Sequence, residues 1–255
     1  EIYNAFDYKK ELLEKGYSFK SKTDTEIVLN LYLQYGIDGL AERINGMYAI
    51  VIVDLRIRKI YFLRDRFGIK PLYFVKNENF LLFASETKAF LETSFFRPEV
   101  NDASLGEYFA FRSPHGTNLL KGVEQAAPGE YLIISLQNGE MEHRRYFDIN
   151  NYKRLSENEM SESEAKRLLK NCFQKSICRQ LKSDVRLGCQ LSGGIDSSLI
   201  TAFALKAQKA SPLDTFSVIV NHLDFSEEKY SDLVCEKLQT NQHKFTLSND
   251  EVIQY

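Results

Sequence analysis

The chain has 255 residues, of which 44% are hydrophobic and 27% are charged. This is ordinary globular composition, and the length predicts one or two domains at ~100–200 residues each. Its 33 Lys and Arg nearly balance its 35 Asp and Glu, which argues against a basic nucleic-acid-binding protein. No apolar run in the sequence approaches the ~20 residues that a membrane-spanning helix needs.

The cysteines and histidines indicate neither a disulfide framework nor a zinc site. All four cysteines lie beyond residue 171, and none belongs to a C-x-x-C pair. A disulfide framework would be denser and more evenly spread. We therefore expect reduced thiols in a cytoplasmic protein. The four histidines are far apart and lack the spacing of zinc ligands.

Two helices are predicted near the start of the chain. Residues 7–15 form the first, because Gly16 is the usual kind of residue to follow a helix C-terminus. Thr23 and Glu26 have the spacing of a capping box, which predicts that the second helix begins there. Gly36 is expected to end this second helix.

A series of strands follows at short spacing. Residues 47–53 are almost continuously apolar, which is typical of a strand covered on both faces. A helix is predicted over 102–111, and Asn138-Gly139 is the strongest short-range signal for a β-hairpin. The first domain, residues 1–150, is therefore mostly sheet, with its other strands predicted over 59–63, 72–75, 80–84, 129–136 and 140–146.

After Tyr146 the pattern changes to alternating strands and helices. Residues 148–158 are polar and typical of a linker. A second capping box, Ser161 with Glu164, opens a long amphipathic helix that reaches about Leu181. The second domain, residues 160–255, is then a parallel doubly wound sheet, with strands over 185–191, 214–220 and 243–247 and helices over 196–208 and 226–238.

The segment 191–198 reads L-S-G-G-I-D-S-S and joins a predicted strand to a predicted helix. Its glycines let the backbone approach an anion, and the N–H groups at a helix start favour negative charge. Asp196 would repel a bare phosphate, so its presence indicates a bridging Mg²⁺. The loop lacks the Gly-Lys-Ser/Thr of a Walker motif. The alternative is a Gly-rich turn in which Asp196 or Ser197 only caps the helix.

This octet resembles the S-G-G-x-D-S loop of the PP-loop ATP pyrophosphatases. The resemblance implies cleavage of Mg-ATP between its α and β phosphates, with adenylation of a substrate oxygen. It also implies that Asp196 is a magnesium ligand, and that Gln190 and Val218 line the nucleotide site. Gln190 stands where members of that family carry an aliphatic or aromatic residue. The implied ATP-binding residues of the loop are Ser192, Gly193, Gly194, Asp196, Ser197 and Ser198.

Five segments of the first half resemble class II glutamine amidotransferase domains, in the version found in glutamine-hydrolysing asparagine synthetases. They are E-I-Y-N at 1–4, T-D-T-E at 23–26, I-N-G-M-Y-A at 44–49, R-D-R-F-G-I-K-P-L-Y at 64–73 and F-A-S-E-T-K at 83–88. The implied fold is an α+β, Ntn-hydrolase-like domain of sandwiched antiparallel sheets, followed by the α/β PP-loop domain.

The resemblance gives some of these residues a role. It implies that Asp24 binds the α-ammonium of glutamine and that Glu1 lies at the same site. The alternative for Asp24 is that it only complements the dipole of the helix it opens. Residues 64–73 are expected to shape the domain instead, with Phe67 and Leu72 packing in its interior.

Class II amidotransferases use an N-terminal cysteine whose own α-amine serves as the base. This chain begins with Glu1, inside its matching motif, and its cysteines all lie in the second half. We therefore expect an internal fragment with no catalytic residue for glutamine hydrolysis and an incomplete synthetase site.

The resemblance implies a glutamine-dependent asparagine synthetase that makes asparagine through a β-aspartyl-AMP intermediate. The implied small-molecule partners are ATP, glutamine and aspartate, with a homodimer as the candidate assembly. Two alternatives stay open. One is a related enzyme with another carboxylate acceptor, such as a carboxylated sugar, and the other is a non-catalytic module that kept the fold.

Overall fold

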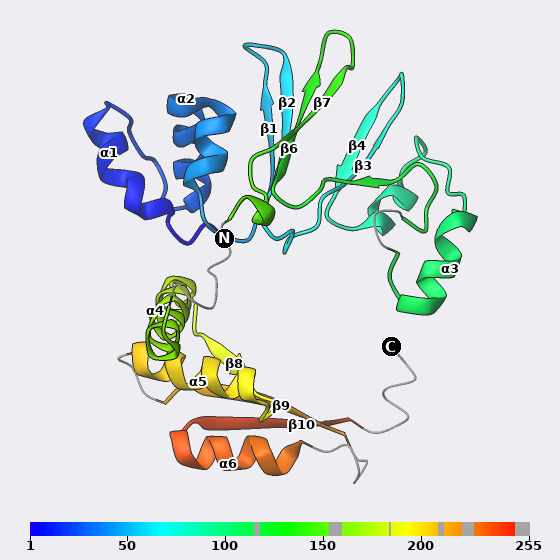
Figure 1. The fold of residues 1–255 in the computed structure, drawn as a ribbon. Helices are drawn as coiled ribbons and strands as arrows, with labels where there is room; N and C mark the ends of the chain where they lie inside the picture. Colours follow the sequence, from blue (N-terminus) through cyan, green and yellow to red (C-terminus); the bar gives the residue numbers. More distant parts are fainter. Residues whose placement is uncertain (115–117, 153–159, 184, 209–211, 221–226, 248–255) are drawn as a thin grey trace. The chain divides into compact units, whose positions relative to one another are not determined.

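The computed structural model describes residues 1–114, 118–152, 160–183, 185–208, 212–220 and 227–247 (Figure 1). The chain divides into two compact units, Glu1–Arg154 and Leu155–Tyr255. Most of the predicted linker, residues 153–158, lies outside the described residues. Among the residues described, no helix has the length and apolar character needed to cross a bilayer.

The first unit contains two antiparallel sheets and three α-helices among its described residues. The strand order is β1-β2-β6-β7 in one sheet and β4-β3-β5 in the other. The helices are α1 (Lys9–Glu14), α2 (Asp24–Arg43) and α3 (Asp102–Phe111). The strands are β1 (Ala49–Asp54), β2 (Lys59–Arg64), β3 (Tyr73–Lys76), β4 (Leu81–Ala84), β5 (Glu124–Gln125), β6 (Glu130–Ser135) and β7 (Met141–Arg145).

Side chains along β2 alternate between the two faces of the sheet, so the strand contributes to a hydrophobic cluster on each face. Ile60 and Phe62 pack with residues of β3 and β6 in one cluster, between the two sheets. Tyr61 and Leu63 point to the other face, where they share a cluster with α2. In Figure 1, α2 and the β3–β4 pair accordingly lie on opposite sides of the larger sheet. The expected fold of sandwiched antiparallel sheets is confirmed.

One strand prediction in this unit needs correction. The strand covered on both faces is β2 rather than β1, because β1 is the edge strand and its Val53 is 51% exposed. Gly36, with a φ of 69°, ends the first helical segment of α2 as predicted, and a second segment follows it and ends at Arg43. The short strand β5 was not predicted, since two polar residues carry no periodic signal.

Asp65 organises the turn that follows β2. Its carboxylate is 1% exposed and accepts four backbone N–H groups, from Tyr48, Phe67, Ile69 and Lys70, at 2.9–3.3 Å. Three of these donors lie in the turn, and Tyr48 lies just before β1. One buried carboxylate therefore closes the turn and ties it to the neighbouring strand.

The two arginines beside Asp65 hold the surrounding backbone. Arg64 is 6% exposed, and its guanidinium donates to the carbonyl oxygens of Gly68, Lys70 and Ala126. Burial lowers its pKa. Arg66 donates to the carbonyl oxygen of Ile44, at the C-terminal end of α2. Both arginines thereby supply hydrogen-bond donors to backbone carbonyls around the turn.

The expected structural role of residues 64–73 is thus confirmed, with one exception. Leu72 is 3% exposed, as predicted, whereas Phe67 is 66% exposed. Phe67 makes an edge contact with Phe147 at a centroid distance of 5.6 Å. It is placed on the surface because the turn around Asp65 uses its backbone N–H and leaves its side chain outward.

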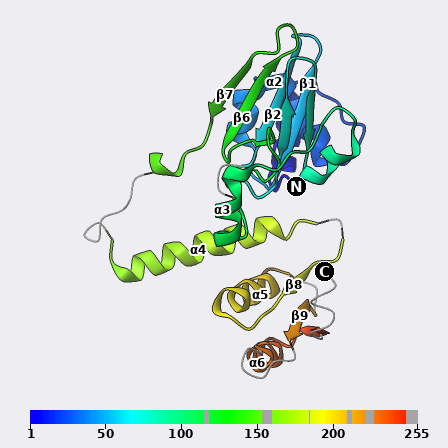
Figure 2. The same ribbon diagram turned by 90° about the vertical axis from the view of Figure 1, so that its right-hand side faces the viewer.

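The second unit is a parallel three-stranded sheet in the order β10-β9-β8. Cys189 of β8 pairs with Thr215 of β9, so both point to one face. Thr215 contacts Cys235 of α6 on that face, and α5 lies on the same side (Figure 2). The elements are α4 (Glu162–Gln180), β8 (Gly188–Gln190), α5 (Ile195–Ala207), β9 (Asp214–Val220), α6 (Glu228–Leu238) and β10 (Asn241–Leu247).

The parallel sheet is confirmed, but not its double winding within the described residues. The opposite face of the sheet carries Phe216, Val218 and Phe245, which are 37%, 63% and 55% exposed. The predicted strand 185–191 is shorter, since Val185 is 76% exposed and outside β8. Ser161 does form the predicted capping box, and only the C-terminal half of α4 packs on α5.

Replacing Asp65 with alanine should lower the free energy of unfolding of the first unit by roughly 3 kcal/mol, because four backbone N–H groups, one buried and three part-buried, lose their acceptor. Urea unfolding followed by far-UV circular dichroism measures the change. Glu78, an exposed residue between β3 and β4, provides the control. Its alanine variant should differ from the unmodified chain by less than about 0.5 kcal/mol, and equal midpoints for both variants would contradict the role of Asp65.

Candidate functional site

A pocket of about 560 Å³ opens in the first unit, and all five sequence motifs contribute to its lining. Glu1, Asp24, Met47, Lys70 and Ser85 each come from a different motif. Their positions span 85 residues of sequence, so the fold brings them together. The sequence pointed only to Glu1 and Asp24 as site residues. The sequence signal for the other three residues was their position inside recognised motifs, which hold Met47, Lys70 and Ser85.

The chain start forms one wall of this pocket by pairing with the segment before β1. Ile2 and Gly46 form an antiparallel bridge, and the backbone N–H of Met47 donates to the carbonyl oxygen of Glu1 at 3.0 Å. A Cβ on residue 46 would press against the Glu1 carbonyl oxygen and lie 2.8 Å from the Ile2 Cα. Only glycine allows the two segments to approach this closely.

Asp24 joins the same wall to the first turn of α2. One oxygen of its carboxylate accepts the backbone N–H of Ile2 at 3.0 Å. The residue lines the pocket at the N-terminal end of the helix, where the dipole favours its negative charge. The carboxylate therefore has a structural contact and also borders the pocket, so the two roles considered for it are compatible.

The helix start was predicted correctly, but half of the capping box differs. The Thr23 hydroxyl accepts the backbone N–H of Glu26 at 3.4 Å, as expected. The Glu26 carboxylate accepts instead from the backbone N–H groups of Lys20 and Ser21, which lower its pKa. The loop before the helix is thereby folded back onto its first turn, beside Asp24.

The second candidate site is the loop after β8. Gly194 is the N-terminal cap residue of α5. The Ser192 hydroxyl lies 3.2 Å from that of Ser197 and accepts the backbone N–H of Gly194 at 3.3 Å, while the Ser197 hydroxyl reaches the Gly194 carbonyl oxygen. The hydroxyl groups of the loop therefore converge on one another at the start of a helix, which is a geometry suited to an anion.

Gly193 has a feature that the sequence did not predict. Its φ is +91°, and a Cβ at this position would lie 2.5 Å from the backbone nitrogen of Ser231 and 2.6 Å from the carbonyl carbon of Tyr230. The loop is thus packed directly against the first turns of α6. No sequence signal indicated this contact, because it joins residues 38 positions apart.

The remaining predicted ATP-site residues lie around this loop. Gln190 pairs with Phe216, and Val218 is two residues further along β9, so Gln190 and Val218 share the exposed sheet face. Ser198 lies in the first turn of α5, and its buried hydroxyl has no hydrogen-bond partner among the described residues. The structure therefore places the predicted residues near one end of the sheet.

Asp196 is the predicted magnesium ligand. It is exposed in the first turn of α5. The described residues contain no group of three or more His, Cys, Asp or Glu side chains able to hold a metal alone. A single carboxylate fits Mg²⁺ that is shared with substrate phosphates, since this ion is usually bound by one or two carboxylates with phosphate oxygens and water.

Comparison with known proteins decides the family. Residues 1–147, more than half of the chain, match the glutamine amidotransferase domain family, and residues 168–255 match the asparagine synthase family. The chain belongs to the glutamine amidotransferase family. A partial asparagine synthase domain follows the amidotransferase domain.

Relatives that match the whole or most of this amidotransferase chain carry two kinds of name. Asparagine synthetase [glutamine-hydrolyzing] 3 of Bacillus subtilis is 30% identical over all of the chain, which spans 43% of that protein. The asparagine synthetase of Gallus gallus is 28% identical over 86% of the chain, which covers 38% of it. Amidase chyE of Penicillium rubens is 34% identical over 78% of the chain, which covers 29% of it. The chain thus spans less than half of these relatives.

Replacing Gly46 with alanine should separate the chain start from the segment before β1 and lower the melting temperature by several degrees, on the scale of a steric conflict costing a few kcal/mol. Differential scanning calorimetry measures this shift. Gly106 of α3 has no atom within 4 Å of its would-be Cβ. The alanine variant at 106 should therefore be unchanged or slightly more stable, and a destabilisation equal to that at 46 would contradict the packing argument.

Proposed function

We propose that this chain is part of a glutamine-dependent asparagine synthetase. In the proposed reaction, ammonia released from glutamine displaces AMP from β-aspartyl-AMP, giving asparagine, AMP, pyrophosphate and glutamate. The observation that carries the proposal is the convergence of five separate motifs on one pocket in a chain whose second unit holds a phosphate-binding type of loop. Neither feature alone points to this pairing of substrates.

The first unit would bind glutamine in its pocket. We propose that Asp24 pairs with the α-ammonium of glutamine, because the residue borders the pocket. The N–H of Ile2 holds one oxygen of the carboxylate in place, and the carboxylate can still accept from the ammonium group. A carboxylate accepts charge-assisted hydrogen bonds from several donors at once. Glu1 lies on the same wall, so we propose that it lines the glutamine site.

The second unit would bind ATP. The proposed phosphate contacts come from the loop after β8 and from the N-terminal end of α5, where the backbone N–H groups and the helix dipole favour an anion. Asp196 would hold Mg²⁺ at this place, and the ion would neutralise charge on the phosphates. We propose that the nucleotide is bordered by Gln190 and Val218. The loop residues in this role are Ser192, Gly193, Gly194, Ser197 and Ser198.

The residues that line the pocket in the first unit include no cysteine. All four cysteines of the chain are free, and all lie in the second unit. We therefore propose that these residues bind and orient glutamine, and that they do not supply a thiol nucleophile to attack its amide.

A second acceptor deserves a test of its own, because the chain is also 33–34% identical to two proteins named as amidases. The name amidase specifies no acceptor, so a carboxylate other than aspartate is the alternative to be tested. The residues described here bind the donor and the nucleotide, and neither group distinguishes among acceptors.

Replacing Asp24 with asparagine should weaken glutamine binding about tenfold or more, since a charge-assisted hydrogen bond contributes roughly 1.5–3 kcal/mol. Isothermal titration calorimetry with glutamine measures the dissociation constant. Asparagine keeps an oxygen for the N–H of Ile2, so folding is preserved. The asparagine variant of Asp7, which lies outside the pocket lining, is the control. Equal affinities in the two variants would remove Asp24 from the site.

Turnover by the full-length protein that contains this chain identifies the carboxylate that accepts the ammonia. Pyrophosphate release from Mg-ATP and glutamine should depend on aspartate, with asparagine as the product. Release that ignores aspartate, in a protein shown to bind ATP, would favour another carboxylate acceptor. The matched control omits glutamine and supplies ammonium, which separates failure of the amidotransferase step from failure of adenylation.

A further inference from the structure

The phosphate-binding loop packs against α6 at Gly193. The glycine Cα lies against the backbone of Tyr230 and Ser231, which is why a Cβ there would be 2.5–2.6 Å from their atoms. Ser231 is 1% exposed. Whatever fixes the first turns of α6 therefore also fixes the middle of the loop, because the two backbones are in direct van der Waals contact.

The residue that follows β8, Leu191, is held by a separate contact. The Ser217 hydroxyl, which is buried, donates to the carbonyl oxygen of Leu191 at 2.7 Å. The backbone N–H of Leu191 donates to Phe216 at 2.8 Å. The loop thus leaves β8 from a fixed point, and the position of α6 sets its course beyond that point.

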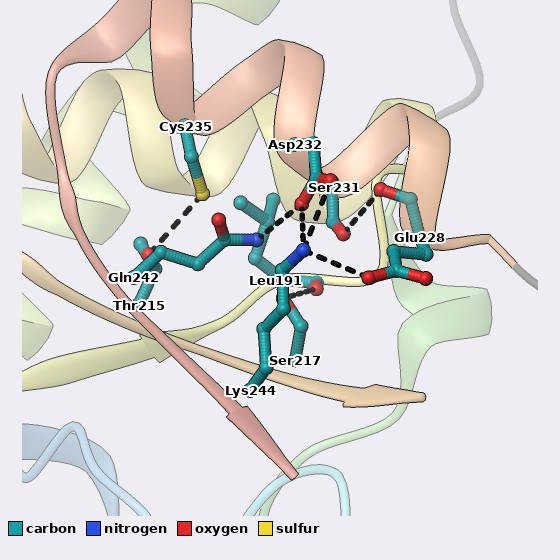
Figure 3. A network of polar contacts seen from close by, with 9 residues as sticks. All are labelled: Leu191, Thr215, Ser217, Glu228, Ser231, Asp232, Cys235, Gln242 and Lys244. Carbon is teal, nitrogen blue, oxygen red and sulfur yellow. Dashed lines mark hydrogen bonds and ion pairs between the residues drawn. The ribbon is translucent and has the colours of Figure 1, made fainter. Parts of the chain in front are cut away.

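Polar contacts attach the first turns of α6 to β10 (Figure 3). The Lys244 ammonium lies 2.8 Å from the Glu228 carboxylate and 2.7 Å from that of Asp232, one turn further along the helix. Gln242, on the same face of β10, donates to Asp232 at 2.9 Å. Figure 3 shows Lys244 reaching from the strand toward both carboxylates, with Ser231 between them in sequence.

The charges of these side chains explain why α6 is drawn toward β10. Glu228 and Asp232 are like charges four residues apart, which repel each other on a helix without a cation between them. Lys244 supplies that cation from another element, with its side chain 35% exposed. The two carboxylates flank Tyr230 and Ser231, the residues that meet Gly193.

We propose that Lys244 is a positioning residue for the phosphate-binding loop. By drawing Glu228 and Asp232 onto β10, it holds the first turns of α6 where they support Gly193. This inference deepens the proposed function, because it rests on the loop being the ATP site. Lys244 does not touch the nucleotide in this scheme, and its effect passes through α6.

The test compares three variants of the chain in the absence of ligand. In Lys244→Gln, amide hydrogen exchange of the peptide covering 192–198 should accelerate about threefold to tenfold, because a weakened support raises the population of locally open states. Lys244→Arg should restore exchange to within about twofold of the unmodified rate, since arginine can also bridge two carboxylates. Lys166→Gln, which breaks the exposed Lys166–Glu162 pair on α4, should leave the loop unchanged.

Loop exchange at the unmodified rate in Lys244→Gln, with faster exchange in α6 alone, would overturn the proposal. Should Lys244→Gln lose its circular dichroism signal, Asp232→Asn provides the same test, because Asp232 is 45% exposed and its loss leaves no buried charge. Loop exchange unchanged in that variant would overturn the proposal equally.

Mg-ATP titration of the same variants tests the proposed ATP site separately from the support of the loop by Lys244. The dissociation constant should rise in Lys244→Gln by about the factor seen in exchange, and return in Lys244→Arg, as linkage between local order and binding requires. If the unmodified chain binds no Mg-ATP, the proposed ATP site fails. The exchange result then still decides whether Lys244 holds the loop.

Discussion

The fold of the amidotransferase unit depends on a buried carboxylate. Asp65 is almost fully enclosed and accepts four backbone N–H groups. A buried charge is costly unless hydrogen bonds replace its hydration, so the turn is committed to the one conformation that provides those donors. That conformation places Lys70 in the pocket lining. It also joins the turn to Tyr48, which lines the pocket at the edge of β1.

Much of what looks like a catalytic signature in this sequence is therefore structural. The side chains of Arg64, Asp65 and Arg66 form their hydrogen bonds with backbone groups. Gly46 is needed for a close approach between two backbone segments. These residues form the scaffold that lets Asp24 and Glu1, from distant parts of the chain, line the same pocket. A motif can thus identify a family strongly while few of its residues contact a substrate.

The second unit uses a different support for its candidate site. Its loop lies at the carboxyl end of a parallel strand, where α/β sheets usually bind ligands. The loop's own serine contacts are local. The middle of the loop depends on α6 through Gly193, and charged side chains attach α6 to β10. The geometry of the loop is therefore coupled to residues far along the chain.

Local patterns in the sequence were sufficient for most elements of this protein. Capping residues gave the starts of α2 and α4, and alternating strands and helices gave the parallel sheet. The motifs also located both candidate sites, because turn glycines and phosphate loops have short, specific patterns. Each of these sequence patterns is made of residues that are close together in the chain.

Only the tertiary structure decided the features that join distant segments. The apolar run in β1 gave no sign that this strand lies at a sheet edge, since neighbours in a sheet are set by pairing across the whole unit. Phe67 was expected inside and lies on the surface, because the hydrogen bonds of Asp65 fix the turn. The contact of Gly193 with α6 has the same origin. Periodicity and motifs report local preference, whereas packing between distant residues is decided by the fold as a whole.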